Sequence, residues 1–392
     1  MSILRRILGE TRAVGGTWIT DNQPLVSSAG VAINSQTALS IGAYYAAVKL
    51  YADTVASLPW DTYIRIDGTR RPYRPSPSWL TMPQPANANF TAFDLKHRMV
   101  SSLLIDGNCF VLFIKGRNGD IVEMRPLDPH KVTIKSVDGS PIYTVMGDDN
   151  VGVELTSDAI LHIPLFATGS SLRAPSPVEQ HRTTLGLASA TQLYSAKFYE
   201  QGAAPSAVIR IPGELTQDQA EQLRSSFSRR HEGIEKMHKI AVLTGGADFQ
   251  QMSMKISDMQ LVETLHWGVE SIARLMGVPL QLLQYPEASS YATSEVLGQA
   301  WLRLGLGPLV TRLEAGLQRL VPGADQTFIK FTIDGLLRPT TKERMDAYAV
   351  QLQNGIRSLN EIRRLEDLSD IEGGDQHWKP LNIGVVGQEP QA

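Results

Sequence analysis

The hydrophobic pattern of this chain of 392 residues changes near Pro177, and that change constrains its fold more than any single motif. Between about residues 60 and 165, short apolar runs alternate with turn dipeptides such as Asp67-Gly68 and Asp138-Gly139, which are typical of tight hairpins. Beyond Pro177, apolar residues recur at helical spacing. The predicted strands are Trp60–Ile66, Cys109–Lys115, Ile121–Arg125, Val132–Val137 and Ile142–Met146. We therefore predict an α+β chain in which an antiparallel sheet precedes most of the helices.

Two helices are predicted to accompany the sheet. Residues 40–58 place apolar side chains at alternating spacings of four and three, and Pro59 follows them. This spacing forms one apolar face of a helix, and proline favours its end. The face consists of Tyr44, Val48, Tyr51, Val55 and Leu58. A second helix is predicted over Ala92–Ile105.

The helical half opens with a helix predicted over residues 178–201 that is rich in small side chains, among them Gly186, Ser189, Ala190 and Ala196. Because small side chains let helix backbones approach closely, we expect this helix to pack against another along its length. A second long helix is predicted from the capping box at Ser257 to Met276, where Gly277 ends it.

A third long helix is predicted to end at about Leu320, and it contains Gly305, Gly307 and Pro308. Proline inside a helix removes a backbone donor and clashes with the preceding turn, so we expect a kink there. Residues 280–293, before this helix, are predicted to be irregular.

Shorter elements complete the prediction. Strands are expected at Val208–Ile211, Ile240–Thr244 and Phe328–Ile333, and a capped helix is expected to open at Thr216. Two further helices are expected near the end of the chain, the first ended by Gly355 and the second capped by Ser358 with Glu361.

The composition excludes several classes of protein. With 42% hydrophobic and 20% charged residues, the chain is not wholly disordered. A net charge of −3 gives no general attraction to nucleic acid or to anionic membranes, and no apolar stretch approaches the roughly 20 residues that span a bilayer. Cys109 is the only cysteine, so an intrachain disulfide is impossible and a reducing compartment is expected.

Motifs that carry catalysis are missing from the sequence. There is no Gly-Lys pair for a phosphate-binding loop, and no G-x-G-x-x-G, H-E-x-x-H or G-x-S-x-G. We interpret His162 as a hydrogen-bonded structural residue and Cys109 as part of the core. Asp148-Asp149 is interpreted as a solvated turn, since nothing supplies the other ligands that a metal needs. We expect no catalytic residue, no cofactor and no metal site.

Cations gather on or just after the helix that opens at Thr216. They are Arg224, Arg229, Arg230 and His231. Because glutamates are interspersed among them, a mixed solvated surface is the simpler interpretation. Contact with a partner protein or with DNA phosphates is the alternative.

Several short motifs follow one another in an order that is characteristic of one family. They are Ser57-Leu58-Pro59-Trp60, Pro85 to Thr91, Gly107-Asn108-Cys109-Phe110, Pro126-Leu127-Asp128-Pro129, Asp158 to His162, Phe198 to Pro205, Gly277-Val278-Pro279, Gly355 with Asn360 to Arg363, and Gly373-Gly374-Asp375. Over about residues 38–380, the chain resembles the portal proteins of long-tailed double-stranded DNA bacteriophages. Two local departures concern only nearby loops: Gln201 replaces the usual Asn before Gly202, and residues 173–177 lack the family's glycine.

The resemblance implies a portal fold with an α+β wing, a two-helix stem, a small α/β clip, a long kinked helix and a helical crown. The implied divisions are an arm at 1–39, the wing at 40–177, stem helices at 178–202 and 257–277, the clip at 203–256, a tunnel loop at 278–293, the kinked helix at 294–322, a strand returning to the wing at 323–339, the crown at 340–380 and a tail at 381–392.

The resemblance also implies a function. Portal proteins form a ring, normally of twelve copies, at one vertex of the capsid, and double-stranded DNA passes through its channel. The implied partners are further copies of the chain, the DNA, the large terminase, a head–tail adaptor and the major capsid protein, with no membrane and no enzymatic activity. The protein would be assembled in the host cytoplasm and reside in the virion.

Particular residues acquire roles from this resemblance. The tunnel loop would present Gln284, Tyr285, Glu287, Ser289, Ser290 and Tyr291 to the channel. This stretch has one acidic residue and no lysine or arginine, which favours sliding of DNA over tight binding. The cations from Arg224 to His231 would contact a clip partner or DNA, and the small residues from Gly186 to Ala196 would support packing of the stem.

Two alternatives remain open on the sequence alone. The chain could be the portal of a domesticated gene-transfer particle. It could instead be a small hydrolase without a recognisable motif, built on the sheet section.

Overall fold

The structure is a computed structural model of the chain. The chain divides into two compact units, residues 1–331 and 332–392. The described residues are 25–27, 29–87, 89–147, 149, 151–166, 172–200, 207–210, 216–218, 221–222, 248–251, 257–283, 291–323, 326–333, 341–366 and 368–377. Mixed helices and antiparallel strands confirm the α+β class.

Short antiparallel sheets make up the strand section of the first unit. Their orders are β1-β2, β10-β5-β6, β13-β3-β4, β7-β8-β9 and β11-β12. The strands are β1 (Leu25–Val26), β2 (Ala32–Ile33), β3 (Trp60–Ile66), β4 (Thr69–Pro72), β5 (Asn108–Lys115), β6 (Ile121–Leu127), β7 (Val132–Val137), β8 (Ser140–Met146), β9 (Gly152–Thr156), β10 (Ile160–Pro164), β11 (Ala207–Arg210), β12 (Asp248–Gln251) and β13 (Thr327–Phe331). The five strands predicted between residues 60 and 146 are confirmed.

The turn dipeptides close the hairpins as their composition predicts. Asp67 (φ 50°) and Gly68 (φ 76°) join β3 to β4, and Asp138 (φ 50°) and Gly139 (φ 78°) join β7 to β8. Positive φ at both central residues suits the twist of a hairpin, and glycine adopts it without strain. A buried cluster forms around β5, made of Phe110, Leu112, Val132, Tyr143, Val145 and Ile160.

Helices α3 (Gly42–Ser57) and α4 (Ala92–Asp106) pack against each other beside the sheets. The apolar face predicted for α3 is buried, and Tyr44 Oη donates a hydrogen bond to the Leu104 carbonyl at 3.1 Å. A capping box between Thr91 and Asp94 opens α4. Gly107, at φ 71°, ends it. Both predicted helices are confirmed.

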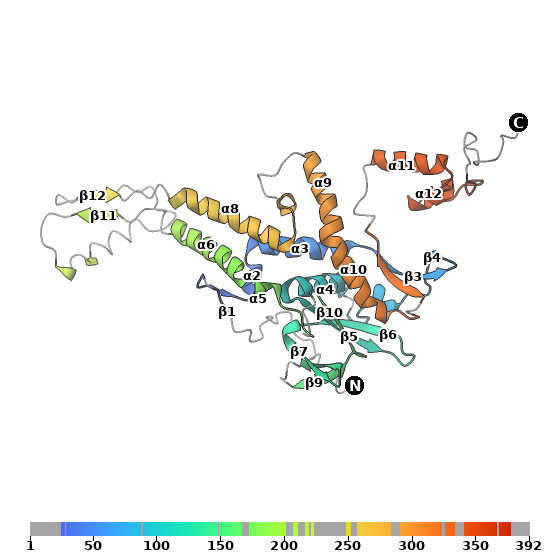
Figure 1. Cartoon of the computed structure of the whole chain (residues 1–392), viewed down its shortest axis with the longest axis horizontal. Helices are drawn as coiled ribbons and strands as arrows, with labels where there is room; N and C mark the ends of the chain where they lie inside the picture. Colours follow the sequence, from blue (N-terminus) through green and yellow to red (C-terminus); the bar gives the residue numbers. More distant parts are fainter. Residues whose placement is uncertain are drawn as a thin grey trace. The chain divides into compact units, whose positions relative to one another are not determined.

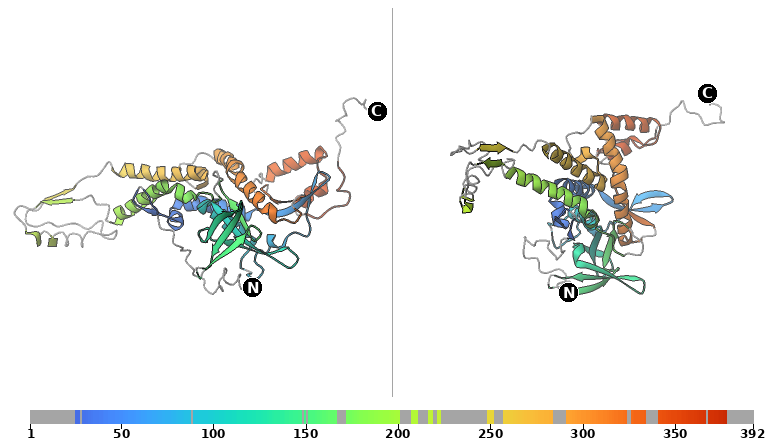
Figure 2. Two further views of the ribbon diagram at one scale, coloured as in Figure 1. Left: turned by 60° about the horizontal axis from the view of Figure 1, so that its bottom comes forward. Right: turned by 60° about the vertical axis from the view of Figure 1, so that its left-hand side comes forward.

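The predicted helix over residues 178–201 is two helices, α5 (Pro177–Gln180) and α6 (Arg182–Glu200). They are separate because the His181 backbone leaves the helical region, with φ −107° and ψ 20°. Helix α8 (Ser257–Met276) ends at Gly277 (φ 63°) as predicted. Helices α6 and α8 run side by side (Figures 1 and 2), and they are in contact.

The predicted kinked helix is a chain of four segments. They are α9 (Tyr291–Trp301), a π-helical turn η5 (Leu302–Leu306), α10 (Gly307–Leu317) and a 3-10 turn η6 (Gln318–Leu320). Pro308 lies in the first turn of α10, where a missing N–H is tolerated. The π-helical turn that precedes it carries the irregularity that the sequence predicts. Before α9, residues Leu280–Leu283 form a 3-10 turn, η4.

Strand β13 pairs antiparallel with β3, with Phe331 opposite Trp60. In the second unit, α11 (Thr341–Gln353) is followed by Gly355 at φ 65°, and the capping box of Ser358 with Glu361 opens α12 (Leu359–Leu365). The predicted strand at Ile240–Thr244 lies outside the described residues, as does most of the helix predicted from Thr216. In the part of the chain that the structure describes, no helix combines the length and apolarity needed to cross a bilayer.

Candidate functional site: the helix pair, its junction and the groove

The helix pair, which we define as α6 and α8, is held together by small side chains. A Cβ placed on Gly268 of α8 would lie 3.7 Å from the Cβ of Ala188 on α6, which is ordinary contact. Ala188, Ile272 and Ala273 are buried. Close approach of the two backbones therefore depends on small residues at the crossing, as the sequence predicts for this helix.

The small residues singled out on α6 have different environments. A Cβ on Gly186 would lie 2.5 Å from the Cβ of Ser27, so Gly186 packs against the segment between β1 and β2 and not against α8. Ser189 and Ala190 are half-buried, and Ala196 is exposed. This side of Gly186 therefore packs against a segment far away in the sequence, and a role for Gly186 in packing of the stem stays a prediction.

Large apolar side chains of the helix pair are exposed. They are Leu187, Leu193 and Tyr194 on α6, and Val262 and Trp267 on α8. Leu193 and Tyr194 are each about half exposed, at 52% and 53%. Leu187 and Tyr194 lie seven residues apart on α6, so they share one face, and an exposed apolar face is typical of a surface that contacts another molecule.

Tyr51 joins α3, the end of α8 and the π-helical turn, and we call this meeting point the Tyr51 junction. Tyr51 Oη donates a hydrogen bond to the Met276 carbonyl at 3.1 Å, and the Tyr51 and Trp301 ring centroids lie 5.0 Å apart. A Cβ on Gly305 would come within 2.8 Å of both Tyr51 Oη and Trp301 Cδ1. Burial raises the pKa of Tyr51, so its hydroxyl stays protonated as a donor. Glycine at position 305 is what lets the turn approach these rings.

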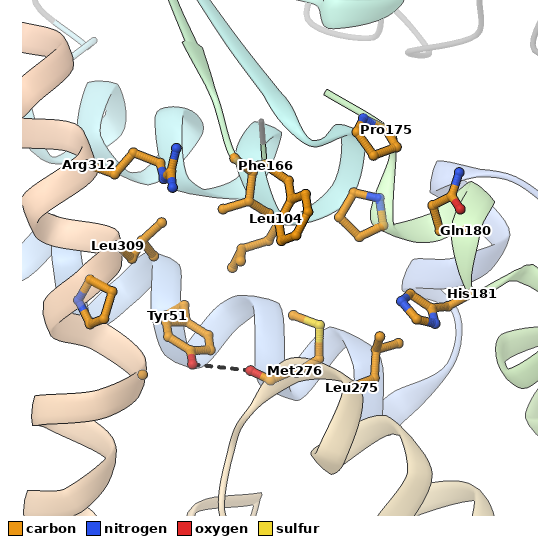
Figure 3. A pocket seen from close by; sticks show the side chains of 14 residues that line it. Tyr51, Leu104, Phe166, Pro175, Gln180, His181, Leu275, Met276, Leu309 and Arg312 are labelled. Atoms are coloured by element: carbon orange, nitrogen blue, oxygen red, sulfur yellow. Dashed lines mark hydrogen bonds between the residues drawn. The ribbon is translucent and has the colours of Figure 1, made fainter. Parts of the chain in front are cut away.

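An apolar groove of about 700 Å³ opens beside the Tyr51 junction (Figure 3). Its walls come from α3, the end of α4, α5, the end of α8 and α10, together with Phe166. Gln180 and His181 lie at one end and Arg312 at the other, where Arg312 Nη1 donates a hydrogen bond to the Pro164 carbonyl. The described residues that line the groove are mostly apolar and include no cluster of acids, bases or nucleophiles, so the groove suits binding of an apolar group.

Asn108 attaches the segment before α5 to the sheet section. Its Nδ2 donates to the Ala174 carbonyl at 2.8 Å, and its Oδ1 accepts from the Ala174 N–H at 2.9 Å. His162 Nε2 lies 3.1 Å from the same Oδ1, and its ring stacks on Phe110 at 4.4 Å. Burial, with Arg173 and Arg319 nearby, lowers the pKa of His162 to about 4. His162 is thus a neutral structural residue, as predicted, and Cys109 is fully buried beside it in sequence.

A serine, a histidine and an aspartate meet at Ser35, His130 and Asp106. His130 Nε2 lies 2.8 Å from Asp106 Oδ1 and 3.1 Å from Ser35 Oγ, and Ser35 Oγ donates to Asp106 Oδ1 at 3.1 Å. A nucleophilic triad needs serine and carboxylate on opposite ring nitrogens, whereas both lie at Nε2 here. The hydrogen bond to Asp106 raises the pKa of His130. This cluster ties three elements together and cannot relay a proton.

Most residues assigned to the channel and the clip lie outside the described residues. These are Gln284, Tyr285, Glu287, Ser289 and Ser290 for the channel, and Arg224, Arg229, Arg230 and His231 for the clip. Tyr291 is the first residue of α9, so it belongs to a helix and not to a loop. The Tyr51 junction and the groove were missed because residues far apart in sequence form them. The one feature of the local sequence that indicated this site was Gly305, three residues before Pro308.

Comparison with known proteins gives a consistent result. The model of the phage portal protein family matches residues 42–367. A probable portal protein of Streptomyces phage phiC31 is 33% identical over 386 residues, which cover 94% of this chain and 84% of the relative. The portal protein of Enterobacteria phage HK97 is 26% identical, with 96% and 93% covered. A chain from the neck of a native gene transfer agent (GTA) particle with C12 symmetry superposes with a TM-score of 0.59 at 24% identity, covering 86% and 92%.

Proposed function

Since this chain belongs to the phage portal protein family, we propose that it forms a ring at one vertex of a capsid and that double-stranded DNA passes through the ring's channel. The observation that carries the proposal is the family match over residues 42–367, which spans the sheet section, the helix pair, the kinked helix and α12. Family membership makes the chain a structural component of the virion and not an enzyme.

Assembly into a ring, normally of twelve copies, is supported by two observations. The GTA neck chain with a similar fold belongs to an assembly with C12 symmetry. The helix pair of this chain also exposes apolar residues on both helices, including Leu193 and Val262, each 52% exposed. A ring needs two different complementary surfaces on each copy, and the exposed sides of the helix pair suit such contacts.

We assign the parts of the portal fold as follows. The wing is 40–177, the stem 178–202 and 257–277, the clip 203–256, the tunnel loop 278–293, the kinked helix 294–322, the strand returning to the wing 323–339 and the crown 340–380, with 1–39 as an arm and 381–392 as a tail. Pairing of β13 with β3 supports the returning strand. Because α9 begins at Tyr291, the end of the tunnel loop moves to residue 290.

The charge of the chain suits a conduit for DNA. At −3 per chain, a ring of about twelve copies carries a clearly acidic charge. The tunnel loop contains Glu287 and no lysine or arginine, so it forms few of the phosphate pairs that would hold DNA in place. Lysines placed at Ser289 and Ser290 should therefore slow packaging, whereas threonines at the same positions should not.

The clip is proposed to dock the large terminase during packaging and the head–tail adaptor afterwards, while the wing contacts the major capsid protein. Arg224, Arg229, Arg230 and His231 are the proposed contacts. Reversing the three arginines to glutamate should weaken binding of terminase or adaptor in a pull-down experiment. The matched control reverses the exposed cations Arg117, Lys135 and Arg182. Equal binding by both variants would refute this assignment.

Oligomeric mass tests the ring directly. Size-exclusion chromatography with light scattering should give many times the 43.1 kDa of one chain, and negative-stain images should show rings with a central hole. Aspartates at Leu193 and Val262 should shift the protein towards monomer. Aspartate at Met82, which is 54% exposed on the sheet section, is the matched control and should leave the ring intact. A monomer for the unaltered chain would contradict the proposal.

The portal of a domesticated gene-transfer particle is a second candidate, because the GTA neck chain shares the fold. The DNA inside purified particles separates the two candidates. A phage packages its own genome, whereas a gene-transfer particle packages fragments of host DNA.

A further inference from the structure

The outer face of the sheet β13-β3-β4 combines aromatic rings with arginines. Tyr63 of β3 lies opposite Phe328 of β13, and Arg65 lies opposite Arg70 of β4. The rings of Tyr63 and Phe328 stack with centroids 5.8 Å apart. The other face of this sheet is buried, with Thr62 at 0% and Ile329 at 2% exposure. Because side chains alternate along a strand, Tyr63, Arg65 and Phe328 share the outer face.

The guanidinium groups on this face lie over the aromatic rings. Arg70 Cζ is 4.0 Å from the centre of the Tyr63 ring, and Arg65 Cζ is 5.5 Å from the centre of the Phe328 ring. Both arginines are exposed. Arg71, the next residue of β4, lies opposite Ile64 and so belongs to the other face of the sheet. Stacking on a ring orients a guanidinium and leaves its N–H donors available to an anion. We call residues 60–72, which form β3, the turn and β4, the arginine hairpin.

Among the described residues, no carboxylate forms an ion pair with Arg65 or Arg70. The ion pair of this region joins Asp61 to Arg74. Asp61 is already engaged, since Arg74 donates to both of its oxygens at 3.0 and 2.6 Å, and Asp67 lies in the turn. Like charges directly opposite on paired strands destabilise a hairpin. The Arg65–Arg70 pair is therefore unfavourable within the chain, and a bound anion would relieve it.

The short length of β4 and its proline limit the kinds of molecule that could bind the arginine hairpin. It is an edge strand of four residues, it is exposed along its length, and it ends in Pro72. A short edge strand with a proline is a poor template for a peptide that adds as a further strand. Arginine side chains, in contrast, match the geometry of phosphate oxygens, and contacts to phosphates need no sequence or backbone register.

We propose that the arginine hairpin binds the phosphate backbone of duplex DNA at a surface separate from the channel. Arg65 and Arg70 donate to the phosphates, and the Tyr63–Phe328 stack supports both guanidiniums from behind. This inference goes beyond the proposed channel, whose tunnel loop has no lysine or arginine. The ring proposal survives if this one fails.

A closed circular duplex tests the proposal, because it cannot thread into the channel of a ring that is already assembled. Binding of a labelled DNA minicircle to the full-length protein is measured between 50 and 300 mM salt. Each phosphate contact contributes about 0.9 to the slope of log K against log salt. The variant R65A/R70A should therefore lose roughly 1.8 from the slope, and its affinity near 0.1 M salt should fall about 60-fold.

Two further variants make the result specific. R117A/K135A removes the same charge from other exposed positions and should bind the minicircle like the unaltered protein. R65K/R70K keeps the charge and should keep most of the slope. The proposal is overturned if the alanine variant binds normally, if the control variant loses as much affinity, or if the lysine variant binds as poorly as the alanine variant. It is also overturned if a polyglutamate peptide binds the hairpin and the minicircle does not.

Discussion

Replacing Gly305 with alanine adds one carbon atom, Cβ, to the Tyr51 junction. The added Cβ would lie 2.8 Å from Tyr51 Oη, 2.8 Å from Trp301 Cδ1 and 3.0 Å from Trp301 Nε1. These neighbours cannot swing away as the end of a flexible chain would. Tyr51 is held by its hydrogen bond to the Met276 carbonyl, and Trp301 is buried at 6% exposure. The turn or the rings must therefore shift.

The free energy of unfolding should fall as a result. Forcing a methyl group into a packed site costs about 1–3 kcal/mol. Alanine in place of glycine in a helix returns up to about 1 kcal/mol through helix propensity. With the full gain from helix propensity, the net destabilisation should be between about 0 and 2 kcal/mol, and Gly305→Ala should be about 1–3 kcal/mol less stable than an unhindered Gly→Ala change.

Gly298 provides a matched control on the preceding helix, α9. A Cβ there would meet nothing within 4 Å, so Gly298→Ala should leave stability unchanged or raise it by up to about 1 kcal/mol. Urea unfolding followed by tryptophan fluorescence compares the midpoints of the two variants with that of the unaltered chain. If Gly305→Ala unfolds at the same urea concentration as Gly298→Ala or at a higher one, close packing at the Tyr51 junction does not depend on glycine.

Three other predictions follow from buried groups. Burial lowers the pKa of Lys96 to about 8, so the unfolded chain binds more protons than the folded chain between about pH 8 and 10.5. The free energy of unfolding should therefore rise by about 3 kcal/mol across that range. Lys96→Met should remove this rise in urea titrations. Burial also lowers the pKa of His162 to about 4, so stability should fall by about 3 kcal/mol as the pH drops from about 6.5 to 4, and His162→Gln should remove that loss. Gly186→Ala should destabilise by about 1–3 kcal/mol through its clash with Ser27, and adding Ser27→Gly should restore most of the melting temperature; no restoration would contradict the contact.

The parts of the fold that the sequence predicts are those with a local physical cause. Turn dipeptides such as Asp67-Gly68 require positive φ, and both residues adopt it. The capping box at Ser358 and the stop at Gly277 satisfy backbone groups of their own helix ends. The sequence predicts a kink at Pro308, and the structure has a π-helical turn, Leu302–Leu306, directly before the helix that contains this proline.

The parts that escape prediction depend on contacts between distant residues. Small side chains on α6 indicate close packing, but they do not identify the segment that packs against them. Gly186 was expected to pack against another helix, and the structure places Ser27 next to it. The break between α5 and α6 at His181 could not be predicted, because no proline or glycine occupies that position. Ser35, Asp106 and His130 come from three elements, and no spacing in the sequence brings them together. The sequence predicts a hairpin around Asp67-Gly68, but only the register of β3 and β4 shows that Arg65 lies opposite Arg70.

Cryo-electron microscopy of the intact particle that contains this chain tests the ring proposal most directly. We expect a ring of about twelve copies at a single capsid vertex, with the exposed side of the helix pair at the contacts between neighbouring copies and DNA in the central channel. Density for the chain as isolated copies, at every vertex, or in a closed assembly without a channel would contradict it.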